Sequence, residues 1–494
     1  MNKHRFSRIV LGGLVAVLAA GALAGCDRPA DPAQVKSPPV ERLGHAGRWL
    51  VDGQGRAVIL HGFNMVNKLT PYTLSAAGFG EEDAAILQKE GFNAVRVGVI
   101  YSAIEPTPGT YDDRYLDDIE KTVAMLARHG IRSLIDFHQD LWGPVFEGEG
   151  MPEWATLTDG MPLGPSRGFP FDYFERAPLA RAFDNFWNNR AGPGGVGLQD
   201  RYAAAWAHVA ARFSRVAGVL GYDLMNEPFP GSMWKDCSIV GCGDFDQRFL
   251  APFWRKLITA IRRADSTTLI FYEPNIIFDF DAATHIPRID DPRLGFSFHP
   301  YVEIAKGLGM AEQHSIATGA GLLASEWGAI TDPAAIRNGA KLMDQAMMSW
   351  LYWTWANKTP FKIPGVGSLL PHGSENQGVV QDLAKPRVRG NLHDDRLAAL
   401  SRPFPHTVAG TPQRYSFDPA TRVFRLLYRP SAVAGQTLVA GAETEIFCPP
   451  RYYPRGYKVT VTGASVVSAP GDSLLRLVNQ PGAAEVTLRV EPEP

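Results

Sequence analysis

Two glutamates stand where apolar stretches of the chain end abruptly. Residues 219–228, VLGYDLMNEP, are largely apolar until Asn226 and Glu227, and GLLASEWGA ends in a similar way at Glu326. Leucine, tyrosine and methionine are typical of a buried strand, which Pro228 must end, so Glu227 is predicted where a strand emerges into a loop. Two carboxyl groups at strand ends are what hydrolysis of a glycosidic bond requires, because one protonates the leaving oxygen and the other attacks the sugar carbon.

Other acidic residues compete for these roles, so spacing alone does not choose the catalytic pair. Glu273 follows another predicted strand, and Asp136 and Asp140 lie around a third one. Any of these acids could instead pair with an arginine or cap a following helix.

The elements that must position these acids alternate along the chain. Near-continuous apolar runs, which are typical of strands covered on both faces in a parallel sheet, occur at residues 58–64, 93–99, 131–138, 219–227, 268–274, 294–301, 321–327 and 351–356. Helical stretches lie between them, for example at 83–90, 115–129, 201–216, 245–264 and 333–348. This alternation predicts an α/β fold, a (β/α)8 TIM barrel over residues 43–395, with a doubly wound open sheet as the alternative.

Polar residues gather at the C-terminal ends of the predicted strands, which favours the barrel. They are Asn64, Arg96, His138, Glu227, Glu273, His299, Glu326 and Trp355. In a barrel these ends converge on one mouth, where the active site of this fold lies.

Residues 141–198 do not fit a simple crossover between strands. The segment is rich in glycine and proline and holds many aromatic residues, namely Trp142, Phe146, Trp154, Phe169, Phe171, Tyr173, Phe174, Phe183, Phe186 and Trp187. An insertion at this place would lie over the barrel mouth and could line a hydrophobic groove. The alternative is a miniature core that packs against itself.

The pattern changes after about residue 395, where short strands separated by turns replace the helical periodicity. Segments such as VFRLLYRP and GYKVTVTG predict a small C-terminal antiparallel β-sandwich over residues 400–494. Such a domain could bind sugars or membranes, or simply pack against the barrel and stabilise it.

The first residues have the pattern of an export signal. Lys3, Arg5 and Arg8 precede an apolar run, and LAGC follows at 23–26, so residues 1–26 resemble a bacterial lipoprotein signal peptide with its lipobox. This resemblance implies cleavage before Cys26, lipidation of that residue, and a membrane-anchored exported protein in the periplasm or at the cell surface. A single spanning helix is the alternative. Residues 27–42, rich in proline, are predicted to be a linker.

The cysteines and the charge limit the remaining options. Export permits a disulfide, and Cys237 and Cys242 could close a glycine-containing loop, or both could stay as thiols. Cys448 is predicted to be a buried apolar residue. These three cysteines have no histidine cluster nearby, so no metal site is expected. The net charge of −2 gives no reason to expect nucleic acid as a partner.

Several short motifs, taken in order, carry a resemblance to a known family. NEP at 226–228, Arg96 in AVRVG, His138 in DFHQD, HPY at 299–301, SEWG at 325–328 and a tryptophan on the last strand resemble glycoside hydrolase family 5, over residues 45–395. GFNMVNKLTPY, DFHQDLW, MNEPFPG, YWTWA and FPHTVAGTP are similar to the endoglycoceramidase branch of that family.

The resemblance implies roles for individual residues. Glu227 would be the acid/base and Glu326 the nucleophile of a retaining mechanism, in which the two carboxyl groups lie about 5–5.5 Å apart. Arg96 and Tyr301 would lie beside Glu326 as charge partner and hydrogen-bond donor. Asn226 would hold the 2-hydroxyl of the sugar.

The same resemblance places further polar groups around the sugar. His138, Asp140 and His299 would complete the polar floor of the site, and Lys68 would reach a sugar hydroxyl; for each histidine the alternative is a buried imidazole satisfied by the backbone. Trp355 would stack on a sugar ring, and for Trp353, on the same face of the strand, a place in the core is the alternative.

The resemblance also implies a substrate. We expect a glycosidase that cleaves between glycan and ceramide in glycosphingolipids, acting as a monomer without a cofactor. Glucosylceramide, steryl glucosides and polysaccharides such as glucan or mannan are alternative substrates within the same chemistry. A sugar-binding lipoprotein without catalysis is the alternative from a different class.

Overall fold

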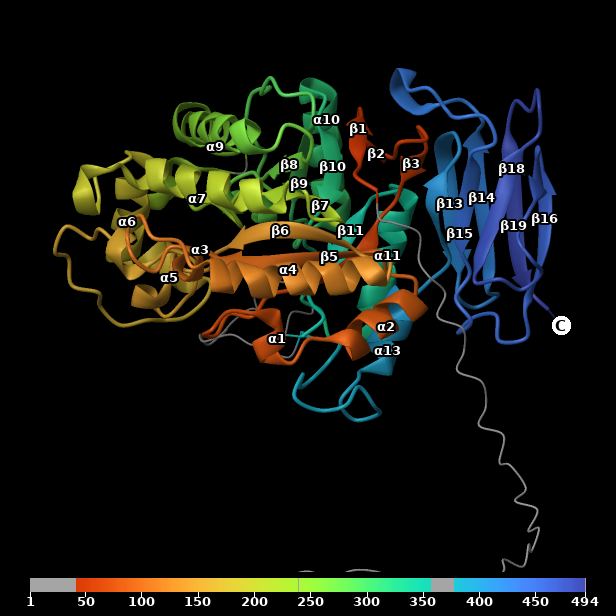
Figure 1. Ribbon diagram of the computed structural model, residues 1–494, viewed down its shortest axis with the longest axis horizontal. Helices are drawn as coiled ribbons and strands as arrows, with labels where there is room; N and C mark the ends of the chain where they lie inside the picture. Colours follow the sequence, from red (N-terminus) through yellow and green to blue (C-terminus); the bar gives the residue numbers. More distant parts are fainter. Residues whose placement is uncertain (1–40, 239, 357–376, 494) are drawn as a thin grey trace, which may run out of the picture. The chain divides into compact units, whose positions relative to one another are not determined.

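The computed structural model describes residues 41–238, 240–356 and 377–493, and eight parallel strands close into a barrel in the order β10-β11-β4-β5-β6-β7-β8-β9 (Figure 1). Their bounds are β4 His61–Met65, β5 Ala94–Ile100, β6 Arg132–His138, β7 Val219–Asp223, β8 Leu269–Tyr272, β9 Leu294–Phe298, β10 Gly321–Ala324 and β11 Trp350–Tyr352. Each strand falls within, or overlaps, one of the predicted apolar runs. The predicted TIM barrel is confirmed, and the open sheet is excluded because the sheet closes. The predicted signal peptide with Cys26 and nearly all of the predicted linker lie outside the described residues.

Burial on both faces explains why the strands read as continuous apolar runs. Every residue of β5 is buried, and the strand pairs in parallel with β4 on one side and β6 on the other. A strand in this position has no solvent face on which alternate polar residues could lie. Arg96 is the exception, a charged residue in the middle of a fully buried strand, and its partners belong to the site described below.

The helices lie outside the strands, as α4, α7 and α9 show in Figure 1. They are α1 Leu74–Ala77, α2 Glu81–Lys89, α3 Tyr101–Ile104, α4 Asp113–Arg128, α5 Phe171–Glu175, α6 Ala177–Trp187, α7 Leu198–Phe213, α8 Gly243–Phe245, α9 Ala251–Ala264, α10 Ile304–Thr318, α11 Pro333–Gln345 and α13 Asp394–Leu400. Asp112 begins α4, because its carboxylate accepts hydrogen bonds from the backbone N–H of Arg114 and Tyr115. Among residues 41–238, 240–356 and 377–493, every helix is too short or too polar to span a lipid bilayer.

Six aromatic side chains of the insertion lie in the main hydrophobic core of the barrel and its helices, rather than in a separate miniature core or along a groove. Trp142, Phe146, Tyr173, Phe183, Phe186 and Trp187 are all buried. The ring of Trp142 meets the ring of Phe183 edge to face at 4.8 Å, and Phe186 meets Phe253 of α9 at 5.1 Å. These six side chains therefore join α6 to the outer helices and are not available to a ligand, whereas Trp154, Phe169, Phe171 and Phe174 keep partial exposure.

The C-terminal strands form the predicted antiparallel sandwich. One sheet has the order β13-β14-β19-β16 and the other β1-β2-β3-β12-β15-β18-β17. The strands are β1 Gly44–Ala46, β2 Trp49–Val51, β3 Ala57–Val58, β12 Phe404–Val408, β13 Thr411–Asp418, β14 Val423–Arg429, β15 Glu443–Phe447, β16 Tyr457–Thr462, β17 Ala464–Val466, β18 Leu474–Asn479 and β19 Val486–Pro492.

The N-terminal strands correct one feature of the predicted domain division. Residues 43–58 were assigned to the barrel domain, but β3 pairs with β12, with Val58 opposite Thr407, so this segment extends a sheet of the sandwich. Local sequence does not reveal this pairing, because it joins strands that are far apart along the chain.

A buried ion pair joins the barrel helices to the sandwich. Arg402 Nε lies 2.8 Å from Asp344 Oδ2, and the hydroxyl of Tyr415 donates to the other oxygen of Asp344 at 3.2 Å. Burial raises the pKa of Asp344 to about 6 even with Arg402 beside it. Without the arginine, Asp344 would be an unpaired buried charge at neutral pH.

We expect Arg402→Met to lower the free energy of unfolding by about 3–5 kcal/mol at pH 7.5, because it leaves that carboxylate uncompensated. Asp344 binds a proton more readily when folded than when unfolded, so the loss should shrink as the pH falls below about 6. Urea unfolding of the wild type and the variant, at pH 7.5 and at a pH below about 6, measures the loss. Arg337→Met, at an exposed position of α11, should change stability by less than about 0.5 kcal/mol. Equal losses in the two variants would contradict the assignment.

Candidate active site

Arg96 is the centre of the polar network at the barrel mouth. Its guanidinium is fully buried, and it donates to Glu326 Oε1 at 2.5 Å and to Asn226 Oδ1 at 3.0 Å. Its other partners are Asn64, Asp136, Asp223 and Glu273. Because the guanidinium is rigid and planar, these bonds fix the ends of several strands relative to one another. Asp136 and Glu273, which competed for the catalytic roles, are thus partners of an arginine.

Glu326 receives a donor on each carboxylate oxygen. Arg96 contacts Oε1, and the hydroxyl of Tyr301 donates to Oε2 at 2.6 Å. Burial and the negative charge of Glu326 raise the pKa of Tyr301 well above its usual value, so the hydroxyl keeps its proton. Both contacts stabilise negative charge on Glu326, which a nucleophilic carboxylate requires.

Glu227 is held in a backbone conformation that few non-glycine residues adopt, with φ of 42°. Its N–H donates to Glu273 Oε2 at 2.8 Å, and its carbonyl accepts from Gln139 Nε2 at 3.1 Å. These bonds hold a strained residue at the strand end, as is common at functional sites. The Glu227 side chain therefore has a fixed direction into the mouth.

The environment of Glu227 favours its protonated form. Burial, together with the nearby negative charge of Asp140, raises the pKa of Glu227 to about 7. A carboxyl group with such a pKa is partly protonated at neutral pH and can serve first as an acid and then as a base.

Glu227 and Glu326 meet at one histidine. Nδ1 of His299 lies 2.9 Å from Glu227 Oε1 and 3.9 Å from Glu326 Oε2. The two carboxylate oxygens therefore cannot be farther apart than the sum of these distances. That limit applies to one oxygen of each carboxyl group, and it is compatible with the spacing of about 5–5.5 Å between the carboxyl groups of a retaining pair.

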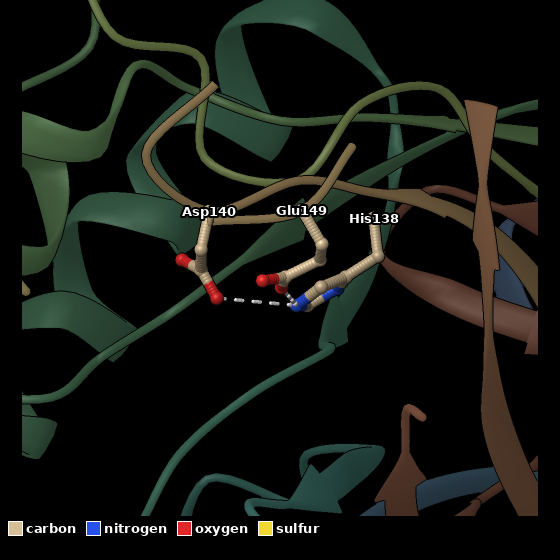
Figure 2. A group of neighbouring side chains, drawn as sticks. All are labelled: His138, Asp140 and Glu149. Carbon is tan, nitrogen blue, oxygen red and sulfur yellow. Dashed lines mark ion pairs between the residues drawn. The ribbon is translucent and has the colours of Figure 1, made fainter. Parts of the chain in front are cut away.

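A second cluster lies beside this pair and holds His138, Asp140 and Glu149, whose carboxyl groups point toward the imidazole (Figure 2). Nε2 of His138 lies 3.6 Å from Asp140 Oδ2 and 3.9 Å from Glu149 Oε1. The ammonium of Lys68 contacts Asp140 and lies 3.2 Å from Glu149 Oε1. Lys68 thus already supplies positive charge between two carboxyl groups that could otherwise ligate a metal.

The histidines bond to side chains rather than to the backbone. Nδ1 of His138 contacts Asp136 at 2.7 Å, and Nε2 of His299 contacts the hydroxyl of Ser325 at 3.2 Å. Burial opposes a charge on His138, but the carboxylates of Asp136 and Asp140 together outweigh it and raise the pKa of His138 to about 9. The alternative of two imidazoles satisfied by backbone is therefore wrong.

The predicted sugar platform is the wrong tryptophan. Trp355 is fully buried, and its indole N–H donates to Asp83 at 2.8 Å, so it belongs to the core. Trp353 lies in the mouth instead, with its ring 5.7 Å from the His138 ring and 4.7 Å from Lys68 Nζ. The predicted strand covers residues 351–356, but β11 ends at Tyr352, so neither tryptophan lies in the strand.

With this geometry established, comparison with known proteins identifies the family. The protein-family model of cellulase (glycosyl hydrolase family 5) matches residues 51–359. The family model of the glycoside hydrolase family 5 C-terminal domain matches residues 402–490. The chain belongs to glycoside hydrolase family 5. The predicted resemblance is confirmed, and the chain is a glycoside hydrolase.

This family 5 member is similar to endoglycoceramidases over most of its length. Endoglycoceramidase I of Rhodococcus hoagii is 30% identical in an alignment 482 residues long, which covers 92% of this chain and 88% of the relative. Endo-glycoceramidase II from Rhodococcus sp., solved as a lactosyl-enzyme intermediate, is 28% identical with a TM-score of 0.71, covering 90% of this chain and 100% of that chain. Its ganglioside GM3 complex is 27% identical with a TM-score of 0.71, covering 90% and 99%.

Several members of the site in this family 5 enzyme were not predicted from sequence. Glu149 lies in the site because its backbone pairs with that of Asp140. Asp223 is an inward-facing residue of β7 that accepts a hydrogen bond from Arg96. Asp279 lies close to Glu227 and His299. The only signal for Asp279 was its place shortly after a predicted strand, which many loop acids share.

A disulfide supports the segment that carries Asp279. Cys237 and Cys242 are bonded, and Cys242 lies against Asn275, whose side-chain oxygen accepts from Ile277 N at 3.1 Å. Asn275 thereby begins the short helix η6, Ile276–Phe280. Cys448 is buried, as predicted.

Proposed function

We propose that this enzyme hydrolyses the bond between glycan and ceramide in glycosphingolipids, with retention of configuration. The observation that carries the proposal is the meeting of Glu227 and Glu326 at Nδ1 of His299. The relatives named endoglycoceramidase, and the ganglioside complex of one of them, support this class of substrate.

In the first step Glu326 attacks the anomeric carbon while Glu227 gives its proton to the glycosidic oxygen. Ceramide leaves, and the sugar remains bound to Glu326 as an ester. Asn226 holds the 2-hydroxyl from a position fixed by Arg96, and Trp353 lines the same mouth with Lys68 Nζ over its ring. The lactosyl-enzyme intermediate of the structural relative supports this covalent step.

In the second step water attacks the same carbon from the side that ceramide left. Esterification has removed the negative charge of Glu326, and this loss favours the ionised form of Glu227. Glu227 then takes a proton from the water, and the enzyme returns to its starting state. Each group invoked comes from one chain, so a monomer is sufficient.

Product analysis tests the proposal. Lactosylceramide, GM3, glucosylceramide, a steryl glucoside and cello-oligosaccharides are incubated separately with the enzyme and the products identified by mass spectrometry. Release of ceramide with an intact lactose or GM3 glycan is the expected result. Cleavage of cello-oligosaccharides alone would contradict the glycolipid substrate, and cleavage of glucosylceramide or steryl glucoside alone would make those alternatives correct.

We also propose that the chain is exported and anchored by a lipid at Cys26, because LAGC follows a basic and apolar leader. In detergent phase separation the wild-type protein should enter the detergent phase, whereas Cys26→Ser should remain in the aqueous phase. Cys448→Ser, which changes a buried cysteine, is the matched control. Equal partition of Cys26→Ser and the wild type would exclude this anchor.

A further inference from the structure

Asp279 lies close to the proposed acid/base Glu227. It lies on η6 after β8 and is only 6% exposed. Glu227, Asp279 and His299 each place one side-chain atom within 4.8 Å of the others, and Asp279 Oδ2 lies 4.0 Å from His299 Nδ1. One carboxylate oxygen of Asp279 therefore lies within hydrogen-bonding reach of the Glu227 carboxyl group, no more than 4.8 Å away.

We propose that Asp279 is the positioning residue of Glu227, to which its carboxyl group donates a hydrogen bond that aims the acid/base and stabilises its ionised form. This inference rests on the proposed function, because it assumes that Glu227 exchanges a proton with the substrate. Asp279 itself touches no reacting atom in this role.

Two oxygens of two carboxyl groups can share a hydrogen bond only if one group keeps a proton. Burial and the charge of Glu227 raise the pKa of Asp279 well above its usual value, so Asp279 is the proton-bearing partner. The hydrogen bond from Asp279 lowers the pKa of Glu227 against burial, which raises it to about 7. Asp279 therefore limits how far burial can raise the pKa of the acid/base.

The other charged groups around the pair come from every neighbouring strand end. They are Lys68, His138 and Asp140 beside Glu227, and Glu273, Tyr301 and Glu326 beside Asp279, with His299 facing both. Both Glu273 and Glu326, beside Asp279, are carboxyl groups, so a further ionised carboxylate at 279 would be unfavourable, whereas a neutral donor is not. A metal ion ligated by Glu227, Asp279 and His299 is the competing possibility, and it would require both carboxyl groups to be ionised.

The test compares Asp279→Leu and Asp279→Asn by their profiles of kcat/KM against pH, with 4-nitrophenyl β-lactoside and lactosylceramide as substrates. Asp279→Leu removes the donor, so the alkaline limb should move up by about one pH unit or more, and kcat should fall about 10- to 100-fold with little change in KM. Asp279→Asn retains an N–H donor and should keep the limb near its wild-type position. Asp279→Ala replaces the leucine variant if that variant does not fold.

Asp281→Asn is the matched control, because Asp281 accepts a hydrogen bond from Glu303 N and is not the proposed partner of Glu227, and asparagine tolerates its positive φ of 65°. An alkaline limb that moves down in Asp279→Leu would show that Asp279 acts as a negative charge and would overturn the inference. An unmoved limb would also overturn it, as would activity lost to a chelator and restored by a divalent metal. If the wild type cleaves neither substrate, it is the proposed function that fails.

Discussion

Glu326→Gln should abolish the release of ceramide from lactosylceramide while leaving the enzyme folded. The amide cannot form the glycosyl ester, so kcat/KM is expected to fall by roughly five orders of magnitude. Arg96 keeps Asp136, Asp223 and Glu273 as charge partners, so the buried guanidinium is not left without compensation. Circular dichroism and thermal unfolding should therefore resemble those of the wild type.

The control for this variant is Glu312→Gln, which makes the same chemical change on a partly exposed ion pair with Arg48. It should retain full activity. A smaller variant, Glu326→Ala, leaves space for azide to enter in place of the carboxylate. Azide then attacks an activated lactoside directly and should yield the α-lactosyl azide. Full ceramide release by Glu326→Gln would refute the assignment of the nucleophile.

The barrel could be predicted because its strands leave a local pattern in the sequence. The error in the domain division arose where the structure depends on contacts between distant segments. Strands buried on both faces are apolar at nearly every position, as β5 is, and such runs are visible without knowledge of the partners. The pairing of β3 with β12 depends on a contact between opposite ends of the chain. Helix α10 is not among the predicted helical stretches for a different reason. Its Gly307 and Gly309 weaken the helical pattern of the sequence.

In the active site too, residues in short sequence motifs could be predicted, whereas residues that the fold alone brings close could not. Glu227, Glu326, Arg96 and Tyr301 belong to recognisable short motifs, and the structure brings them together. Asp279 comes close to Glu227 only through the fold of the segment after β8, so nothing adjacent in sequence marks it. The exchange of Trp353 for Trp355 has a different cause, since it depends on the residue at which β11 ends.

Glu227→Gln should show a loss that depends on the leaving group. With lactosylceramide the departing alkoxide needs a proton, so kcat/KM should fall about 10²- to 10⁴-fold. With 2,4-dinitrophenyl β-lactoside the leaving group needs none, and kcat/KM should change little. The second step still lacks its base, so the lactosyl-enzyme should accumulate and appear as a burst of dinitrophenol. Glu153→Gln, at an exposed position of the insertion, should behave as the wild type on both substrates.

The pH dependence and azide rescue of the same variant make the role of Glu227 specific. The first step needs protonated Glu227, whose pKa is raised to about 7 by burial first and by Asp140, so wild-type kcat/KM should fall as the pH rises through about 7. Glu227→Gln cannot titrate and should lose this alkaline limb. Azide needs no general base, so it should relieve the slow second step and give the β-lactosyl azide, opposite in configuration to the product expected from Glu326→Ala. If the alkaline limb persists in Glu227→Gln, another group is the acid, and Asp279 is then the nearest carboxyl group that retains its proton.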